Sequence, residues 1–151
     1  MTDAWVSAVL GVAVAALALF GAIAVGFVRL LRLNGGRGGW RRLAREFASD
    51  RPMPAAALHR QTIRVGAVAY RRSAEIGADA DGLHLALSGA GRLFGLPPLL
   101  LPWPQIAESE PARLYGRPAM RLTVPSAATD LHLYLQTYQV LVAAGARKAA
   151  S

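Results

Sequence analysis

The sequence predicts a mainly β domain that follows one N-terminal transmembrane helix. The first observation is an uncharged apolar stretch from Ala4 to Val28. The second is the alternation of apolar and polar residues after Arg60, which is the period of β-strands. The third is a return to helical spacing after Thr137. About six or seven short antiparallel strands with one final helix favour a small barrel or sandwich that the helix closes.

Residues 1–28 are expected to form the membrane anchor. The 25 residues from Ala4 to Val28 would form a helix about 37 Å long, whereas the hydrocarbon core of a bilayer is about 30 Å thick. A cleaved signal peptide is the alternative, but it requires a basic segment ahead of the apolar stretch. Only Met-Thr-Asp precedes it here, so we expect a permanent single-pass anchor.

Positive charge is concentrated directly after the anchor. Residues 29–72 carry eleven Arg against Glu46 and Asp50, whereas basic and acidic residues balance over 73–151. The positive-inside rule therefore predicts an inner or plasma membrane protein whose N-terminus faces out and whose C-terminal domain is cytoplasmic. Charge next to the bilayer favours anionic inner-leaflet headgroups as partners and argues against nucleic acid. The expected membrane-surface contacts are Arg29, Arg32, Arg37, Arg41, Arg42, Arg45 and Trp40.

Two short segments are expected between anchor and domain. Residues 29–39 predict a basic, glycine-rich linker that bends freely, because glycine offers little resistance to bending. Residues 40–58 predict a juxtamembrane amphipathic helix and its connection, since Trp40, Leu43 and Phe47 fall on one helical stripe. This stripe either lies in the membrane interface or packs on the β domain, and the shortness of the helix favours packing.

The predicted domain covers residues 59–151. Turn residues at 79–82 separate two alternating runs and predict a hairpin, and a second hairpin is expected about Gly116 and Arg117. Prolines around Leu99–Leu101 allow at most a short or edge strand. The expected strands lie at 60–67, 73–78, 83–87, 99–101, on both sides of the 113–122 turn, and at 131–135, where Leu131, Leu133 and Leu135 alternate.

Three segments of this domain lie downstream of the membrane anchor: Gly82–Leu87 after its turn, Leu100–Ile106, and the final strand with its helix. Together they resemble the bacterial pleckstrin-homology-like (PH-like) domains of small single-pass membrane proteins. The resemblance covers residues 60–148. It implies a PH-like fold and a binding or scaffolding role, with no catalytic residue and no lipid-headgroup specificity to carry over.

No residue set predicts a metal, cofactor or catalytic site. The chain has no cysteine, which excludes disulfides and thiolate chemistry. Asp79 and Asp81 form too short a loop for calcium and predict a plain turn. His84 and His132 lie opposite the leucine face and could meet across neighbouring strands, but they lack a third ligand, so surface histidines are expected.

The apolar run 93–103 is a candidate interfacial or partner-binding loop. Leu96, Leu99 and Trp103 are the residues that would contact the membrane interface or a partner. The alternative is a core strand in which Leu99 and Trp103 point inward together with Leu101, and this alternative is favoured.

The functional expectation is a non-enzymatic, membrane-tethered binding or scaffolding module at the cytoplasmic membrane surface. The alternative is an accessory subunit of a larger membrane complex, and an enzyme acting on an envelope or lipid substrate is less favoured. A protein partner or a second copy could pack against the anchor through Ala18, Ala22 and Gly26, whose spacing lets helices approach closely. No cofactor is expected.

Overall fold

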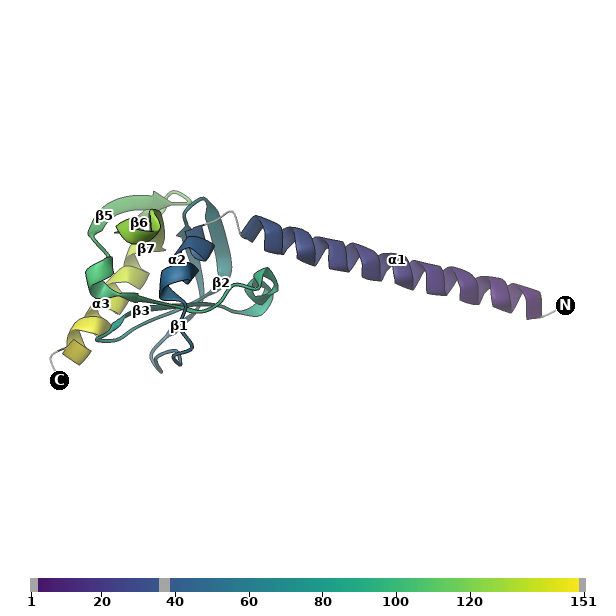
Figure 1. Ribbon diagram of the computed structural model, residues 1–151, viewed down its shortest axis with the longest axis horizontal. Helices are drawn as coiled ribbons and strands as arrows, with labels where there is room; N and C mark the ends of the chain where they lie inside the picture. Colours follow the sequence, from purple (N-terminus) through teal and green to yellow (C-terminus); the bar gives the residue numbers. More distant parts are fainter. Residues whose placement is uncertain (1–2, 36–38, 150–151) are drawn as a thin grey trace.

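A computed structural model describes residues 3–35 and 39–149 and shows one long helix projecting from a curled β domain (Figure 1). The helix, α1 (Asp3–Gly35), precedes a seven-stranded antiparallel sheet that curls into a half-barrel, and α3 (Leu135–Ala149) ends the described chain. The predicted fold class is confirmed, and the domain is loosely PH-like.

The sheet has the strand order β4-β3-β2-β1-β7-β6-β5, so that its two edges are β4 and β5. Every neighbouring pair is antiparallel, as expected for short strands joined by turns. The strands are β1 (Leu58–Val65), β2 (Val68–Ala78), β3 (Gly82–Leu87), β4 (Leu99–Pro102), β5 (Glu108–Leu114), β6 (Arg117–Val124) and β7 (Thr129–Tyr134). Three 3-10 helices, η1 (Gly89–Phe94), η2 (Trp103–Gln105) and η3 (Pro125–Ala127), lie in its connections.

Both predicted hairpins are present, but one turn is displaced. β2 and β3 pair as expected, with Ile76 opposite Leu85. In the second hairpin Leu114 pairs with Arg117. The turn is therefore Tyr115–Gly116 and not Gly116–Arg117, with φ of 51° and 74° at the two turn residues. Positive φ at both positions is typical of the two-residue turn that matches the twist of the flanking strands.

A third hairpin, between β1 and β2, was not predicted. The alternation was expected to continue through Ala67, but the chain turns at Gly66 and Ala67, and Val65 pairs with Val68. Gly66 has a φ of 58°, and a Cβ there would lie 3.0 Å from the backbone nitrogen of Gly39. Glycine is thus required at this turn both by its conformation and by the close approach of α2 (Gly39–Phe47).

The boundaries at both ends of the domain also differ from expectation. Leu135 begins α3 instead of ending the last strand, and only Leu131 and Leu133 place their side chains in the core. At the other end, α1 continues to Gly35 and α2 starts at Gly39, so most of the predicted linker 29–39 is helical. Its first half is rich in Leu and Arg, which favour helix. Residues 36–38 lie outside the described residues.

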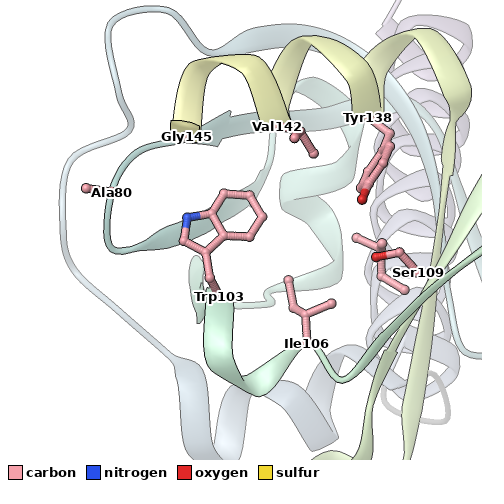
Figure 2. Close-up of a pocket in the computed structure, with 8 residues that line it drawn as sticks. Ala80, Trp103, Ile106, Ser109, Tyr138, Val142 and Gly145 are labelled. Carbon is pink, nitrogen blue, oxygen red and sulfur yellow. The ribbon is translucent and has the colours of Figure 1, made fainter. Parts of the chain in front are cut away.

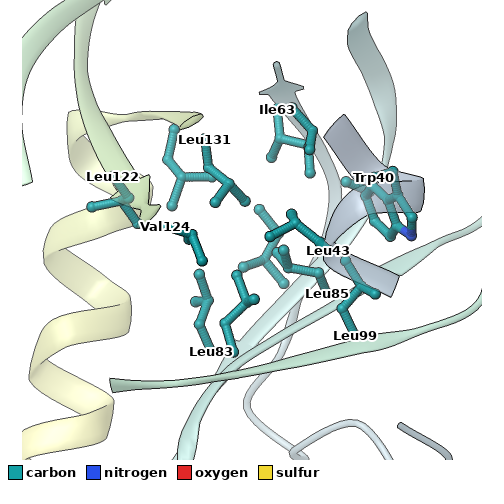
Figure 3. Packing of buried hydrophobic residues seen from close by; sticks show 14 of the residues in the cluster. Trp40, Leu43, Ile63, Leu83, Leu85, Leu99, Leu122, Val124 and Leu131 are labelled. Atoms are coloured by element: carbon teal, nitrogen blue, oxygen red, sulfur yellow. The ribbon is translucent and has the colours of Figure 1, made fainter. Parts of the chain in front are cut away.

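The core fills the concave side of the sheet and includes α2. Trp40 and Leu43 are 0% exposed and lie among strand residues such as Leu85 and Leu99 (Figure 3). Trp40 Nε1 donates a hydrogen bond of 2.9 Å to the carbonyl of Pro97. The helix therefore packs on the domain, which was the favoured alternative, and Trp40 cannot contact a membrane because it is enclosed.

Aromatic rings fix α2 against the sheet. The ring of Tyr70 meets Trp40 edge to face, with centroids 5.3 Å apart, and meets Phe94 of η1 at 5.5 Å. The hydroxyl of Tyr70 has no hydrogen-bond partner among the described residues, and burial raises the pKa of this phenol to about 12. Tyr70 thus acts as an apolar side chain in the core.

Candidate functional site

The most exposed apolar surface lies on α1. From Trp5 to Leu30 the helix is long and apolar enough to cross a membrane, and none of this segment is buried against the domain. Phe20, for example, is 78% exposed. In the described part of the domain the exposed large apolar side chains are scattered, at Leu93, Tyr115, Val140 and Val142. The described chain therefore has a single helix that could serve as a membrane span.

The arginines at the end of this span and after it are exposed wherever their side chains are described. Arg29 is exposed near the end of α1, and Arg41, Arg42 and Arg45 are exposed on α2. Arg42 also donates a hydrogen bond of 3.5 Å to the carbonyl of Ala128. The predicted contacts Arg32 and Arg37 lie outside the side chains that the structure describes. α2 thus separates its buried apolar face from an exposed basic face.

An apolar groove lies beneath α3 (Figure 2). Tyr138 and Val142 of α3 face Trp103 and Ile106 across a space of about 350 Å³. The indole is fixed by a hydrogen bond of 2.8 Å from Trp103 Nε1 to the carbonyl of Asp79. The groove is lined by Ala80, Trp103, Ile106, Ser109, Leu122, Tyr138, Val142 and Gly145.

The predicted interfacial loop does not form one exposed surface. Leu99 is 2% exposed in β4, and Leu96 packs against the core. Trp103 lies beyond the strand, partly buried in the groove, where a Cβ on Gly145 would come within 2.8 Å of its ring. The favoured alternative is correct for Leu99 and Leu101, which point into the core. The run is therefore divided between the edge strand and the groove, and partner binding at Trp103 stays a prediction.

The two histidines are far apart in the sheet, and His84 is buried. β1 and β2 separate β3 from β7, so His84 and His132 do not meet. His84 is 4% exposed, which corrects the expectation of a surface histidine. Met53 and Pro54 cover its cross-strand partner Gly77, at which a Cβ would lie 2.9 Å from Pro54 Cδ.

The predicted turn after β2 is present and orders His84. The carboxylate of Asp79 accepts hydrogen bonds from the backbone amides of Asp81, at 2.9 Å, and Gly82, at 3.1 Å. Its other oxygen lies 2.8 Å from His84 Nε2. Burial alone would raise the pKa of Asp79, but the hydrogen bonds from His84 and the two amides outweigh it, so the pKa is below its ordinary value. Within the described residues, no group of three or more His, Asp or Glu side chains could hold a metal ion.

A second hollow, which sequence reasoning missed, is lined by arginines. Arg60 of β1, Arg71 and Arg72 of β2 and Arg117 of β6 surround a space of about 610 Å³. The other described lining residues are Gln61, Thr62, Tyr134, Gln136 and Thr137, so no carboxylate and no histidine is among them. The adjacent Arg71 and Arg72 were a signal in the sequence, but Arg60 and Arg117 join them only through the fold.

These observations define two open hollows on a domain attached to an exposed apolar helix. One hollow is apolar and lies beneath α3, and the other is basic and shares no lining residue with it. Comparison with known proteins adds no assignment, since no protein-family model matches the chain and neither curated proteins nor solved structures give a match.

Proposed function

We propose that the protein is a non-enzymatic, membrane-tethered binding or scaffolding module of PH-like fold. The observation that carries the proposal is α1, whose apolar segment Trp5–Leu30 is unburied throughout although it adjoins a domain with a complete core. Leaving such a surface in water is unfavourable by roughly 25 cal/mol per Å². A bilayer removes this cost without any rearrangement of the domain.

The charge distribution supports a cytoplasmic position for the domain. Arg29 lies at the end of the apolar segment, and Arg41, Arg42 and Arg45 follow it on α2, all of them exposed. Each Arg held near an anionic leaflet contributes about 1 kcal/mol of attraction. The proposed localisation is therefore the inner or plasma membrane, with the arginines at the cytoplasmic headgroups.

A binding role fits the hollows better than catalysis does. The groove beneath α3 offers a hydroxyl from Ser109 and a phenol from Tyr138, but among the residues that the structure describes neither it nor the arginine hollow is lined by a histidine or carboxylate that could act as a base. Open hollows on a tethered domain suit capture of a ligand close to the membrane. The tether would act by restricting the search for that ligand to the membrane surface.

The test of the tether is extraction of the full chain from isolated membranes with alkaline carbonate. We expect the protein to stay in the membrane pellet at its full mass, because an integral helix resists this wash. Introducing Leu17→Arg together with Phe20→Arg should release it, since each buried Arg costs roughly 2.5–3.5 kcal/mol at the helix centre. Val140→Arg, at an exposed position of α3, is the matched control and should change nothing.

Release of the unaltered chain by carbonate would contradict the tether. A mass shortened by the N-terminal segment would instead show a cleaved signal peptide and would equally overturn the proposal.

A further inference from the structure

The arginine hollow is built by two irregularities in the pairing of β1 with β2. Between the pairs Leu58–Ile76 and Gln61–Ala74, β1 has one residue more than β2. Between Gln61–Ala74 and Ile63–Tyr70, β2 has two residues more than β1. Such bulges redirect side chains that a regular strand would point to alternating faces.

Arg60 lies in the first bulge, and Arg71 and Arg72 lie in the second. Arg60 has a φ of 53° and Arg72 a φ of 49°, a conformation that is unusual for residues other than glycine. The backbone amide of Arg72 donates a hydrogen bond of 3.1 Å to Thr62 Oγ1, which closes the second bulge. As a result, three arginines from neighbouring strands line the same space.

The hollow lies on the side of the sheet that faces away from the core. Thr62 and Tyr134 line it, and they alternate with Ile63 and Leu133, which are 0% exposed. Two of its lining residues hold each other in place where α3 begins, since the buried Thr137 donates a hydrogen bond of 3.0 Å to Gln61 Oε1. The site therefore has fixed polar groups as well as charges.

Two of the guanidinium groups rest on aromatic rings. Arg71 Cζ lies 4.5 Å from the centre of the Tyr115 ring, and Arg117 Cζ lies 4.8 Å from the centre of the Tyr134 ring. These contacts restrict the two side chains while leaving their N–H donors free to bind a further group. The arginines are thus held in place by contacts that do not neutralise them.

No described carboxylate forms a salt bridge with any of the four arginines. Elsewhere on the domain charges are paired, as in Arg51 with Asp81 and Arg121 with Glu110. Four like charges around one space repel each other, and the repulsion is relieved when an anion enters. The guanidinium fork matches the oxygens of phosphate groups and can bind them in a bidentate manner.

We propose that this hollow is a binding site for a ligand with more than one phosphate group. A space of about 610 Å³ lies within the usual range for small-molecule sites and exceeds what a single phosphate needs. The ligand is either a soluble phosphorylated compound or the headgroup of a phosphorylated lipid, which present the same chemistry to the arginines. The proposal is independent of the direction in which α1 crosses the membrane.

The test is calorimetric titration of the full chain in zwitterionic detergent with pyrophosphate, at fixed ionic strength. Removing two arginines that bind the anion should weaken binding by about tenfold or more, because the charge-assisted hydrogen bonds from two guanidinium groups are lost. The variant is Arg71→Gln with Arg117→Gln. Arg64→Gln with Arg113→Gln removes the same charge from exposed positions outside the hollow and should weaken binding less than about threefold.

A charge-preserving variant separates fork geometry from net charge. Arg71→Lys with Arg117→Lys should bind with intermediate affinity, because Lys keeps the charge but loses the bidentate fork. Unchanged thermal unfolding of all three variants is the condition for comparing them.

Nanodiscs identify the source of the phosphate. If phosphatidylinositol 4-phosphate in phosphatidylcholine nanodiscs reduces pyrophosphate binding more than phosphatidylserine at equal surface charge does, the ligand is a lipid headgroup with more than one phosphate. If it has no greater effect than phosphatidylserine while pyrophosphate still binds, the ligand is soluble, and both results support the site. Absence of pyrophosphate binding, or an equal loss in the two Gln double variants, would overturn the proposal.

Discussion

His132 on β7 lies between two arginines, since its cross-strand neighbours are Arg64 on β1 and Arg121 on β6. Burial lowers the pKa of His132, the charge of Arg64 lowers it further, Asp130 partly opposes this, and Arg121 adds to it. Its Nδ1 atom is buried without a hydrogen-bond partner among the described residues. The folded protein therefore favours the neutral imidazole. Arg42 lines the same hollow as Arg64 and His132 and is a further positive charge on this side of the imidazole.

This histidine should make the domain less stable in mild acid. In the unfolded chain His132 takes up a proton as the pH falls below about 6.5, whereas in the folded protein it stays neutral to lower pH. The unfolded state then binds more protons, so unfolding becomes easier as the pH falls below about 6.5. His132→Leu should flatten this dependence, measured by urea unfolding at pH 7 and pH 5.

Gln139→Leu, at an exposed position of α3 that does not titrate, is the matched control. It should leave the acid dependence as in the unaltered protein. The same slope in His132→Leu as in the unaltered protein would show that His132 is not the source.

Among the elements, α2 is the helix whose packing holds the domain together most testably, because its Trp40 is fully buried in the core. Trp40→Ala should destabilise the domain by about 3–5 kcal/mol, because removal of the enclosed indole creates a cavity and leaves the carbonyl of Pro97 without its hydrogen bond. Pulse proteolysis in urea measures the loss. Arg45→Ala, on the exposed face of α2, should shift the midpoint little. An unchanged midpoint in Trp40→Ala would mean that α2 lies elsewhere, such as in the membrane interface.

Elements set by local chemistry could be predicted from the sequence. The β2–β3 hairpin was predicted because Asp79 and Gly82 supply turn chemistry between alternating runs, and β4 was predicted as a short edge strand because prolines flank it. The Gly66 turn was missed because Val65 and Val68 flank only two turn residues and the alternation of Ile63 and Val65 continues through Ala67 in the sequence.

The arginine hollow could not be predicted, for a different reason. It depends on bulges in the register of β1 and β2, and on the packing of β6 near them, which are properties of the assembled sheet. His84 shows the same limit. Its position opposite the leucine face was correct, but Met53 and Pro54, which lie against its cross-strand partner Gly77, come from a segment that the alternation does not describe.

Packing of a neighbouring helix against α1 stays a prediction. Ala18, Ala22 and Gly26 keep the spacing that allows close helix packing, and a Cβ on Gly26 would meet nothing within 4 Å. The face is therefore open to a neighbouring helix in the membrane, as an accessory subunit of a larger complex would require.

At the scale of the whole molecule, the structure places the domain at the end of α1 that carries the arginines. α1 contacts η1, which exposes Leu93, and extends away from the sheet (Figure 1). A helix of 33 residues is about 50 Å long and so extends beyond the hydrocarbon core. Its basic end and the exposed face of α2 would then lie together at one membrane surface.

The central claim is that this surface is cytoplasmic, and cysteine accessibility tests it most directly because the chain has no cysteine of its own. Single variants Thr2→Cys and Ser126→Cys, the latter at an exposed position, are treated with a membrane-impermeant maleimide in intact and permeabilised cells. We expect Thr2→Cys to react in intact cells and Ser126→Cys to react only after permeabilisation. Labelling of Ser126→Cys in intact cells would contradict the cytoplasmic position of the domain.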